Sequence, residues 1–158
     1  MEKIERIILS CESDTEALAY QCAQLVVPGM TLYLHGDLGA GKTYFSRAML
    51  QSLGVKGRIK SPTYTIVEPY FVEGLGDLFH FDFYRLSNVE EVEYLGLENY
   101  DQAYLSLIEW PNKAGAYLLK PDISFMFFYD DAGRRVSVEG MTKVGDIVVK
   151  ALKEGGFL

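Results

Sequence analysis

One segment, Gly36-Asp37-Leu38-Gly39-Ala40-Gly41-Lys42-Thr43, constrains the fold of this chain more than any other feature. It matches the pattern G-x-x-x-x-G-K-[ST]. A compact apolar run, Met30 to Leu34, precedes it, and an amphipathic helical pattern follows from about Lys42 to Leu53, where Gly54 ends it. A strand, a glycine-rich loop and a helix in this order predict a loop that binds the phosphates of a nucleotide.

The chemistry of phosphate binding explains each residue type in the motif. Glycines let backbone N–H groups surround phosphate oxygens without Cβ clashes, and the helix N-terminus favours an anion. Lys42 is placed to reach the β- and γ-phosphates, and the Thr43 hydroxyl is placed to ligate magnesium. We therefore predict that the nucleotide is bound by residues Gly36, Asp37, Leu38, Gly39, Ala40, Gly41, Lys42 and Thr43.

The rest of the chain alternates short strands with helices, which predicts an α/β fold in one compact domain over residues 1–158. Residues 63–72 with 78–86, and 123–129 with 135–139, have the composition of two antiparallel hairpins. Capping boxes predict that helices begin at Ser13 and Ser87.

Charge and cysteine content narrow the class of protein. The net charge of −7 argues against a protein whose main role is to grip nucleic acid. The basic stretch 42–60 and the acidic stretch 90–101 are most simply solvated faces, and the alternative is that both meet partners. No apolar run is long enough for a membrane span, and the first residues do not predict a signal peptide. Only Cys11 and Cys22 are present, which favours the reducing cytosol.

Two acidic residues are candidates for catalysis because each follows a hydrophobic strand pattern. Asp82 lies within Leu78–Tyr84, and Glu109 ends the run Leu105–Glu109. Phosphoryl transfer needs carboxylates of this kind to bind metal or to orient a nucleophile. The pattern does not decide which of the two activates water and which mainly holds magnesium. His80 falls on the same strand face as Asp82, where we expect a hydrogen-bonded core residue.

Three further features are ambiguous on composition alone. The hydroxyl-rich segment Ser61–Thr65 falls where many NTPases place a switch that senses the γ-phosphate, so Thr63 or Thr65 would contact metal or phosphate. Trp110, the only tryptophan, fits either a core residue or an exposed anchor for a partner. Arg134 and Arg135 lie at a hairpin end, where solvated side chains are favoured and the alternative is that either one reaches the nucleotide.

Three classes of nucleotide-dependent protein contain a phosphate loop of this kind and differ in the other motifs they need. A GTPase is disfavoured because Asn112-Lys113-Ala114-Gly115 lacks the aspartate of the guanine-binding motif. A small-molecule kinase is a weak alternative, since the second half shows no long lid segment rich in arginine. An ATP-driven accessory protein needs only a nucleotide site, a switch and a binding face, and it fits best. A nucleotide-gated binding module, in which hydrolysis is incidental, stays open beside it.

Four ordered blocks of the sequence resemble the bacterial TsaE (YjeE) family, the ATPases of the tRNA threonylcarbamoyladenosine pathway. The blocks are residues 36–43, Ser61-Pro62-Thr63-Tyr64-Thr65, His80-Phe81-Asp82-Phe83-Tyr84-Arg85-Leu86 and Ile108-Glu109-Trp110-Pro111. The acidic stretch from Glu90-Glu91 to Leu95-Gly96 also resembles the family pattern. The resemblance covers about residues 15 to 140.

This resemblance implies a P-loop NTPase fold, three layers α/β/α with a mixed sheet that has a parallel core and antiparallel hairpins. It implies an ATPase that hydrolyses ATP to ADP with Mg²⁺ and acts in the cytoplasm with TsaB and TsaD, which modify a tRNA adenosine next to the anticodon. The chain would meet tRNA indirectly, through that complex, and direct contact of the chain with tRNA stays open. On this chain Lys42, Thr65, Asp82 and Glu109 would be catalytic. Thr43, Asp82 and Glu109 would hold the metal, and Trp110 would face a partner.

Overall fold

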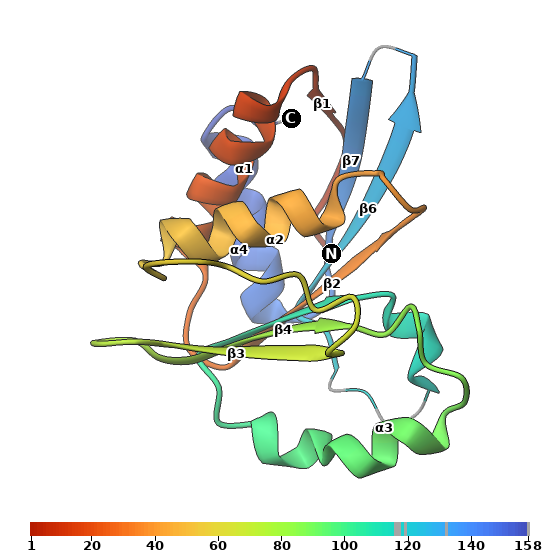
Figure 1. The fold of residues 1–158 in the computed structure, drawn as a ribbon. Coiled ribbons are helices and arrows are strands. Elements are labelled where there is room, and N and C mark those ends of the chain that lie inside the picture. Colours follow the sequence, from red (N-terminus) through yellow and green to blue (C-terminus); the bar gives the residue numbers. More distant parts are fainter. Residues whose placement is uncertain (116–117, 119, 132, 158) are drawn as a thin grey trace.

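The computed structural model describes residues 1–115, 118, 120–131 and 133–157, and within them seven strands form one sheet (Figure 1). The strands are β1 (Lys3–Leu9), β2 (Met30–Gly36), β3 (Val67–Val72), β4 (Gly76–Asp82), β5 (Leu105–Glu109), β6 (Ile123–Asp130) and β7 (Gly133–Gly140). The helices are α1 (Glu12–Leu25), α2 (Lys42–Ser52), α3 (Glu90–Leu95) and α4 (Lys143–Glu154), with short 3-10 turns η1 (Leu97–Tyr100) and η2 (Pro111–Lys113).

The sheet has a parallel centre and antiparallel edges, in the order β1-β7-β6-β2-β5-β4-β3. β2 runs parallel to both β5 and β6, and β4 runs parallel to β5. The hairpins β3/β4 and β6/β7 and the pair β1/β7 are antiparallel. The predicted mixed sheet is therefore confirmed. Because four neighbouring strands are parallel, their carboxyl ends share one edge of the sheet, where ligands of open α/β sheets bind.

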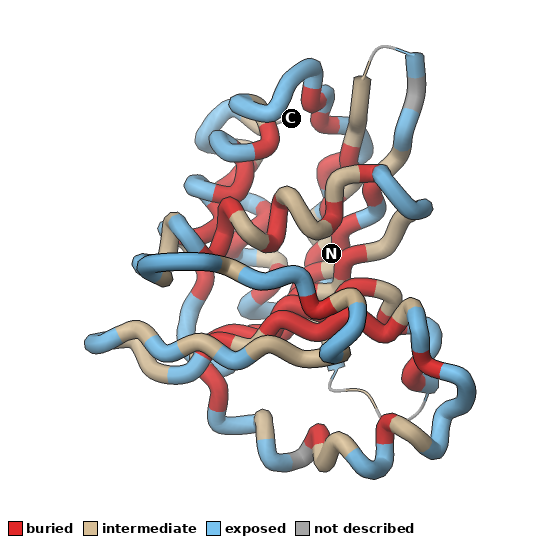
Figure 2. The backbone as a smooth tube through the Cα atoms, viewed as in Figure 1, coloured by how far each residue is buried: buried red, intermediate tan, exposed pale blue. Residues whose placement is uncertain are grey.

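Helices lie on both faces of the sheet, but unequally. Figure 1 shows α1, α2 and α4 on one face and α3 on the other. One large apolar cluster fills the space under the three helices, and a smaller one, with Phe81, Phe83 and Ile108 at its centre, lies on the α3 side. The buried backbone runs along the middle of the molecule between these layers (Figure 2). The three-layer α/β/α arrangement predicted for the chain is confirmed.

Strand alternation decides which side chains of β4 and β5 face α2. On β4, Leu78 belongs to the cluster under α2, whereas Phe81 belongs to the cluster on the α3 side. His80 and Asp82 therefore share the face of Leu78. On β5, Leu107 faces α2 and Ile108 faces the other side, so Glu109 again points to the α2 side. Both carboxylates thus end apolar stripes that face the phosphate loop.

The predicted capping boxes are wrong in detail. The N-cap residues are Cys11 for α1 and Val89 for α3, and neither side chain caps its helix. Instead of Ser13 acting as cap, the Asp14 carboxylate accepts a hydrogen bond from the Ser10 backbone N–H at 2.8 Å. Several polar side chains compete for the same few N–H groups at a helix start, so sequence alone does not decide which one bonds.

Candidate nucleotide site

The predicted phosphate loop connects β2 to α2, and two of its glycines are required by geometry. Gly36 has φ +142°, and a Cβ there would lie 2.6 Å from the Phe127 carbonyl oxygen. Gly41 has φ +110°, and a Cβ there would lie 3.0 Å from Arg134 Cδ. Any other residue at Gly36 would clash with the backbone of β6, and one at Gly41 would be strained.

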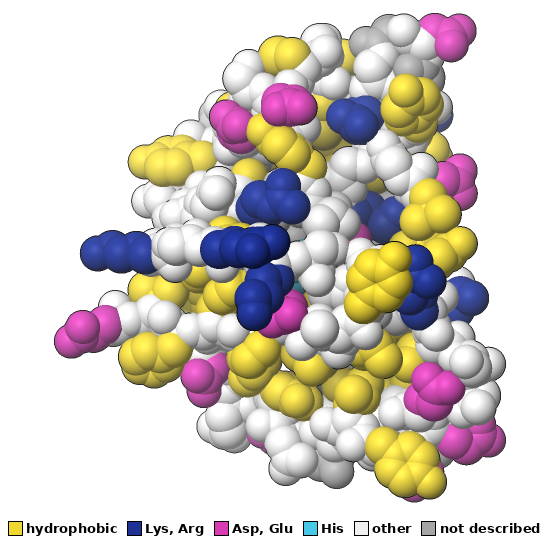
Figure 3. Space-filling view, viewed as in Figure 1, with side chains coloured by type: hydrophobic (Ala, Val, Ile, Leu, Met, Phe, Trp, Pro, Cys, Tyr) yellow, Lys and Arg dark blue, Asp and Glu magenta, His cyan; other side chains and the backbone are white. Residues whose placement is uncertain are grey.

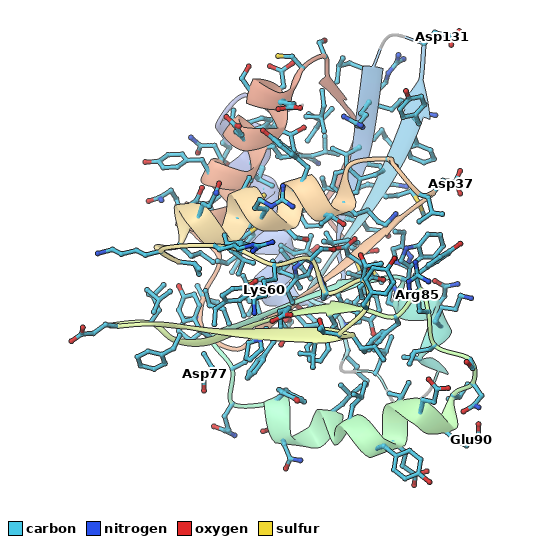
Figure 4. All side chains as sticks on the ribbon, viewed as in Figure 1. Asp37, Lys60, Asp77, Arg85, Glu90 and Asp131 are labelled. Atoms are coloured by element: carbon cyan, nitrogen blue, oxygen red, sulfur yellow. The ribbon has the colours of Figure 1, made fainter. Side chains whose placement is uncertain are left out.

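The loop ends at the N-terminus of α2, where the helix leaves backbone N–H groups unpaired. Gly41 is the N-cap residue and no side chain caps the helix. Asp37, Leu38 and Gly39 are exposed, and Asp37 lies at the outer tip of the loop (Figure 4). The structure therefore brings residues 36–43 together as one loop with free N–H donors at its helical end, which is the arrangement that binds anions.

The Lys42 side chain is folded into this loop rather than exposed. Its ammonium donates to the carbonyl oxygens of Gly36 at 2.5 Å and Asp37 at 2.8 Å, and the residue is 4% exposed. Burial lowers the pKa of Lys42, while the nearby carboxylates of Glu109, Asp82 and Asp37 act in the opposite direction. A buried cation thus lies inside the loop, held by the loop's own carbonyl groups.

Glu109 is the residue that joins the loop to the sheet. Its Oε1 accepts a hydrogen bond from the Thr43 hydroxyl at 2.9 Å, and its Oε2 lies 2.5 Å from His80 Nε2. Glu109 and His80 are each 1% exposed. The prediction that His80 is a hydrogen-bonded core residue is confirmed, and its partner is one of the two candidate carboxylates. The predicted magnesium ligands Thr43 and Glu109 are in direct contact.

Asp82 lies directly across from Glu109 on the neighbouring strand. Its Oδ1 accepts the Tyr84 backbone N–H at 2.9 Å, and the side chain is 5% exposed. Burial raises the pKa of Asp82, and the hydrogen bond from Tyr84 partly offsets this rise; the Glu109 charge adds to it. Two carboxylates and Lys42 therefore meet at one edge of the sheet, as the strand-end pattern predicts.

A residue with a strained backbone conformation contacts or adjoins each of the two carboxylate residues, Asp82 and Glu109. Among the described non-glycine residues, only Ile66 (φ 72°) and Trp110 (φ 56°) have positive φ. The carbonyl of Ile66 accepts the Asp82 N–H at 2.8 Å, and Trp110 directly follows Glu109. A left-handed conformation costs a non-glycine residue on the order of 1–2 kcal/mol, so such residues are often found at functional sites.

Trp110 is half-buried against the phosphate loop. The Lys42 ammonium lies 4.6 Å from the centroid of its ring, and the Tyr84 ring lies 4.9 Å away on centroids. Its backbone N–H donates to the Leu34 carbonyl at 3.3 Å. The indole therefore combines a core contact with an exposed part, and its predicted role toward a partner stays a prediction.

The side-chain hydroxyls of the segment Ser61–Thr65 bond within the segment and to Glu68. The Thr65 hydroxyl donates to Glu68 Oε1 at 3.0 Å, and the hydroxyls of Ser61 and Thr63 lie 2.7 Å apart. Tyr64, 80% exposed, stacks on Arg85 with 4.3 Å between guanidinium and ring centroid. The structure therefore does not bring Thr65 to Lys42 or Glu109, and its switch role stays a prediction.

Arg134 stays partly exposed, as predicted, but also contacts the phosphate loop. Its Nε and Nη2 donate to the Gly39 carbonyl oxygen at 3.2 and 3.1 Å, so an arginine of the β6/β7 hairpin grips the phosphate loop. Arg135 instead places its guanidinium 4.0 Å from the centroid of the Phe128 ring. The sequence does not predict the contact between Arg134 and Gly39, because this contact depends on β6 lying next to β2.

The donors present fit a magnesium ion. Among the described residues no three His, Cys, Asp or Glu side chains form a metal-binding group. Magnesium is usually held by one or two carboxylates together with hydroxyl, phosphate and water oxygens rather than by a full protein cage. Thr43, Glu109 and Asp82 supply the hydroxyl and the carboxylates at the edge where the phosphates would lie.

Lysine and arginine side chains gather on the surface beside the site. Figure 3 shows them over α2 and the loop that follows it, and Lys60 of that loop is labelled in Figure 4. Lys56, Arg58 and Lys60 are exposed and Arg47 is half-buried. This is the basic stretch predicted from the sequence, and its exposure agrees with a solvated face.

The family model described as "Threonylcarbamoyl adenosine biosynthesis protein TsaE" matches residues 9–136. A tRNA threonylcarbamoyladenosine biosynthesis protein TsaE from Haemophilus influenzae is 42% identical over 121 residues, 76% of each chain. The protein of the same name from Rickettsia felis is 37% identical over 118 residues, 74% of this chain and 68% of that protein.

A solved structure, the crystal structure of Bacillus subtilis YdiB, matches the fold with a TM-score of 0.78 and 26% sequence identity. The match covers 97% of this chain and 94% of that chain. The sheet order and the phosphate loop described above, together with this match, make this a P-loop NTPase fold. Given the family model and the relatives, the chain belongs to the TsaE family.

Proposed function

We propose that this protein binds and hydrolyses ATP as an accessory protein of the machinery that makes threonylcarbamoyladenosine in tRNA, acting with TsaB and TsaD. One P-loop domain over residues 1–158 would do both. The observation that carries the proposal is the buried Glu109, which accepts a hydrogen bond from the Thr43 hydroxyl at the carboxyl edge of the sheet. Together with the names of the relatives, this supports hydrolysis in the service of tRNA modification.

Different groups of the site would bind the phosphates and the metal. The N–H groups at the start of α2 and the Lys42 ammonium bind the phosphates, and Lys42 leaves its loop carbonyls to do so. Magnesium, held by Thr43 and the carboxylates, would neutralise charge that develops on the phosphate oxygens. Because the Thr43 hydroxyl donates a hydrogen bond to Glu109, the lone pairs of the Thr43 oxygen stay available to the metal.

The carboxylates then orient the attacking water. Glu109 and Asp82 face the site from adjacent strand ends, and either can accept a proton from water. Burial raises the pKa of Asp82, so its ionised form is a stronger base than an aspartate with the usual pKa. Glu109 already accepts two hydrogen bonds, so we assign it mainly to holding Thr43 and the metal, and Asp82 to the water.

The location and partners of the protein complete the proposal. None of the helices in the described part of the chain has the length and apolar content that crossing a bilayer requires. We place the protein in the cytoplasm, where tRNA is modified. We further infer that Trp110, whose ring is partly exposed beside Lys42, contacts a partner, and that Thr65 senses the γ-phosphate once the nucleotide is bound.

The test is ATP hydrolysis by the pure protein, alone and with TsaB and TsaD. We expect slow ATP turnover by the protein alone and a marked rise in the rate when TsaB and TsaD are both present. Lys42→Ala should abolish both the slow and the stimulated turnover. A rate that the partners do not change would contradict the accessory role and leave the nucleotide site standing. Transfer of phosphate from ATP to a metabolite would identify a small-molecule kinase instead.

A further inference from the structure

His80 is a buried histidine that the proposed chemistry does not use. It lies on β4, opposite Leu107 of β5, and reaches along the shared face of the sheet to Glu109. The Nε2···Oε2 distance is 2.5 Å, and the two side chains are 1% and 2% exposed. A contact this short between two groups shielded from water constrains both side chains.

The chemistry of the pair fixes which nitrogen carries the hydrogen. An ionised carboxylate only accepts hydrogen bonds, so His80 Nε2 must be the donor. The other ring nitrogen, Nδ1, is buried and has no hydrogen-bond partner among the described residues. A hydrogen on Nδ1 would be a buried donor without an acceptor, so the ring is held as the Nε2–H tautomer. His80 therefore donates to Glu109 and to nothing else in the described part of the chain.

Glu109 is consequently held at both oxygens by different elements. Thr43 of α2 donates to Oε1, and His80 of β4 donates to Oε2. Two donors on opposite oxygens define the plane of the carboxylate and keep Oε1 toward the phosphate loop. Without His80, Oε2 would be a buried, unpaired acceptor, and the carboxylate would turn to find another donor such as Lys42.

We propose that His80 is a positioning residue that orients Glu109, so that this carboxylate holds Thr43 and the metal instead of pairing with the loop lysine. This inference rests on the proposed function and deepens it. Partners of metal-binding groups that lie one contact away from the metal typically change metal affinity or activity 10- to 100-fold when removed.

The variants separate the hydrogen bond from the space that the ring fills. His80→Leu removes the donor, and His80→Gln keeps an amide nitrogen at about the reach of Nε2. His80→Asn carries the same amide one bond shorter and should not reach Glu109. Ser106→Ala is the control for stability, since it changes another buried polar side chain, near the start of β5 and away from the loop.

The first readout does not depend on turnover. Calorimetry gives the affinity for ADP with and without Mg²⁺, and the ratio measures how well the site couples metal to nucleotide. We expect His80→Leu and His80→Asn to lower this ratio about 10-fold or more, with metal-free ADP affinity within about 2-fold of wild type. His80→Gln should recover most of it, and kcat of partner-stimulated hydrolysis at saturating Mg²⁺ and ATP should follow the same order.

A second readout needs neither nucleotide nor partner. Nitrogen chemical shifts of the His80 imidazole in the free protein report the tautomer, and we expect Nε2–H with slow exchange of its hydrogen. The Nδ1–H tautomer would overturn the proposal. So would equal defects in His80→Leu and His80→Gln, or a loss in His80→Leu no larger than in Ser106→Ala at matched Tm. Failure of wild-type protein to bind ADP would instead contradict the proposed function, and the imidazole shifts would still decide the pairing.

Discussion

Thr43 at the start of α2 donates its hydroxyl hydrogen to Glu109 at the end of β5, across 2.9 Å in space and 66 residues of sequence. The contact aligns the hydroxyl so that its lone pairs point away from the carboxylate. It exists because β5 lies beside β2, which places the last residue of one strand next to the loop that follows the other. The loop and the carboxylate therefore act as one unit.

Replacing Glu109 by glutamine tests that unit. Thr43 and His80 bond to different oxygens of Glu109, and glutamine replaces one of these oxygens with an NH₂ donor that faces Thr43 or His80. We expect partner-stimulated hydrolysis to fall at least about 100-fold, with ADP affinity in the absence of metal within about 3-fold of wild type. Initial rates and calorimetry measure the two effects. Glu139→Gln on β7 is the matched control, and hydrolysis preserved in Glu109→Gln would remove Glu109 from the mechanism.

If Glu109→Gln stops hydrolysis but leaves tRNA modification intact in the reconstituted system, the protein is a nucleotide-gated binding module. The accessory-ATPase proposal instead expects modification to fail over repeated turnovers. Counting modified tRNA per complex distinguishes a single round from continued turnover.

Asp82→Asn should change stability and activity in opposite directions. Because burial raises the pKa of Asp82, the folded protein binds this proton more tightly than the unfolded chain, and the ionised form destabilises the fold. The penalty is absent below the ordinary pKa of aspartate and develops as pH rises through the raised value. Asparagine lacks the charge and keeps the oxygen that accepts the Tyr84 N–H.

We therefore expect Asp82→Asn to raise Tm at neutral pH by about 2–4 °C, and the gain to vanish near pH 3. Hydrolysis should fall at the same time. Thermal unfolding of both proteins from acid to neutral pH measures the first effect. A variant less stable than wild type at pH 7 would show that the Asp82 charge stabilises the fold.

Arg134→Ala should weaken nucleotide binding without unfolding the protein. The two bonds from Arg134 to the Gly39 carbonyl hold the outer part of the loop, and their loss leaves that part freer before the nucleotide orders it. We expect ADP affinity to fall about 3- to 10-fold, or about 0.7–1.4 kcal/mol. Arg135→Ala is the matched control because its guanidinium lies over Phe128. Equal affinities in the two variants would contradict a role of Arg134 in the loop.

Thr65→Ala tests the predicted role of Thr65 as a switch residue that senses the γ-phosphate. Its hydroxyl bonds to Glu68 here, so a switch role requires the segment to move when a γ-phosphate is bound. We expect ADP affinity to stay the same and affinity for a non-hydrolysable ATP analogue to fall about 5-fold. Thr63→Ala is the neighbouring control, and a loss of ADP affinity in Thr65→Ala would point to a structural effect.

Local patterns predicted most elements of this fold and the acids that end β4 and β5, but not the residues that begin α1 and α3. The glycine-rich loop and the acids at Asp82 and Glu109 follow from patterns a few residues long, and the sheet edge brings them together. These short patterns did not predict the contacts between residues that lie far apart in the sequence. Arg134 reaches Gly39 across 95 residues of sequence, which requires the strand order β6-β2. The partner of His80 likewise depends on β4 lying next to β5.

Trp110 is the only tryptophan of the chain, and its indole lies 4.6 Å from the Lys42 ammonium. Indole emission is quenched or shifted when a nearby charge moves. A nucleotide that draws Lys42 away from its loop carbonyls would therefore change the fluorescence of the unlabelled protein. The Trp110 ring is therefore an intrinsic fluorescent probe of the site, which would allow nucleotide binding and release to be followed in real time by stopped flow.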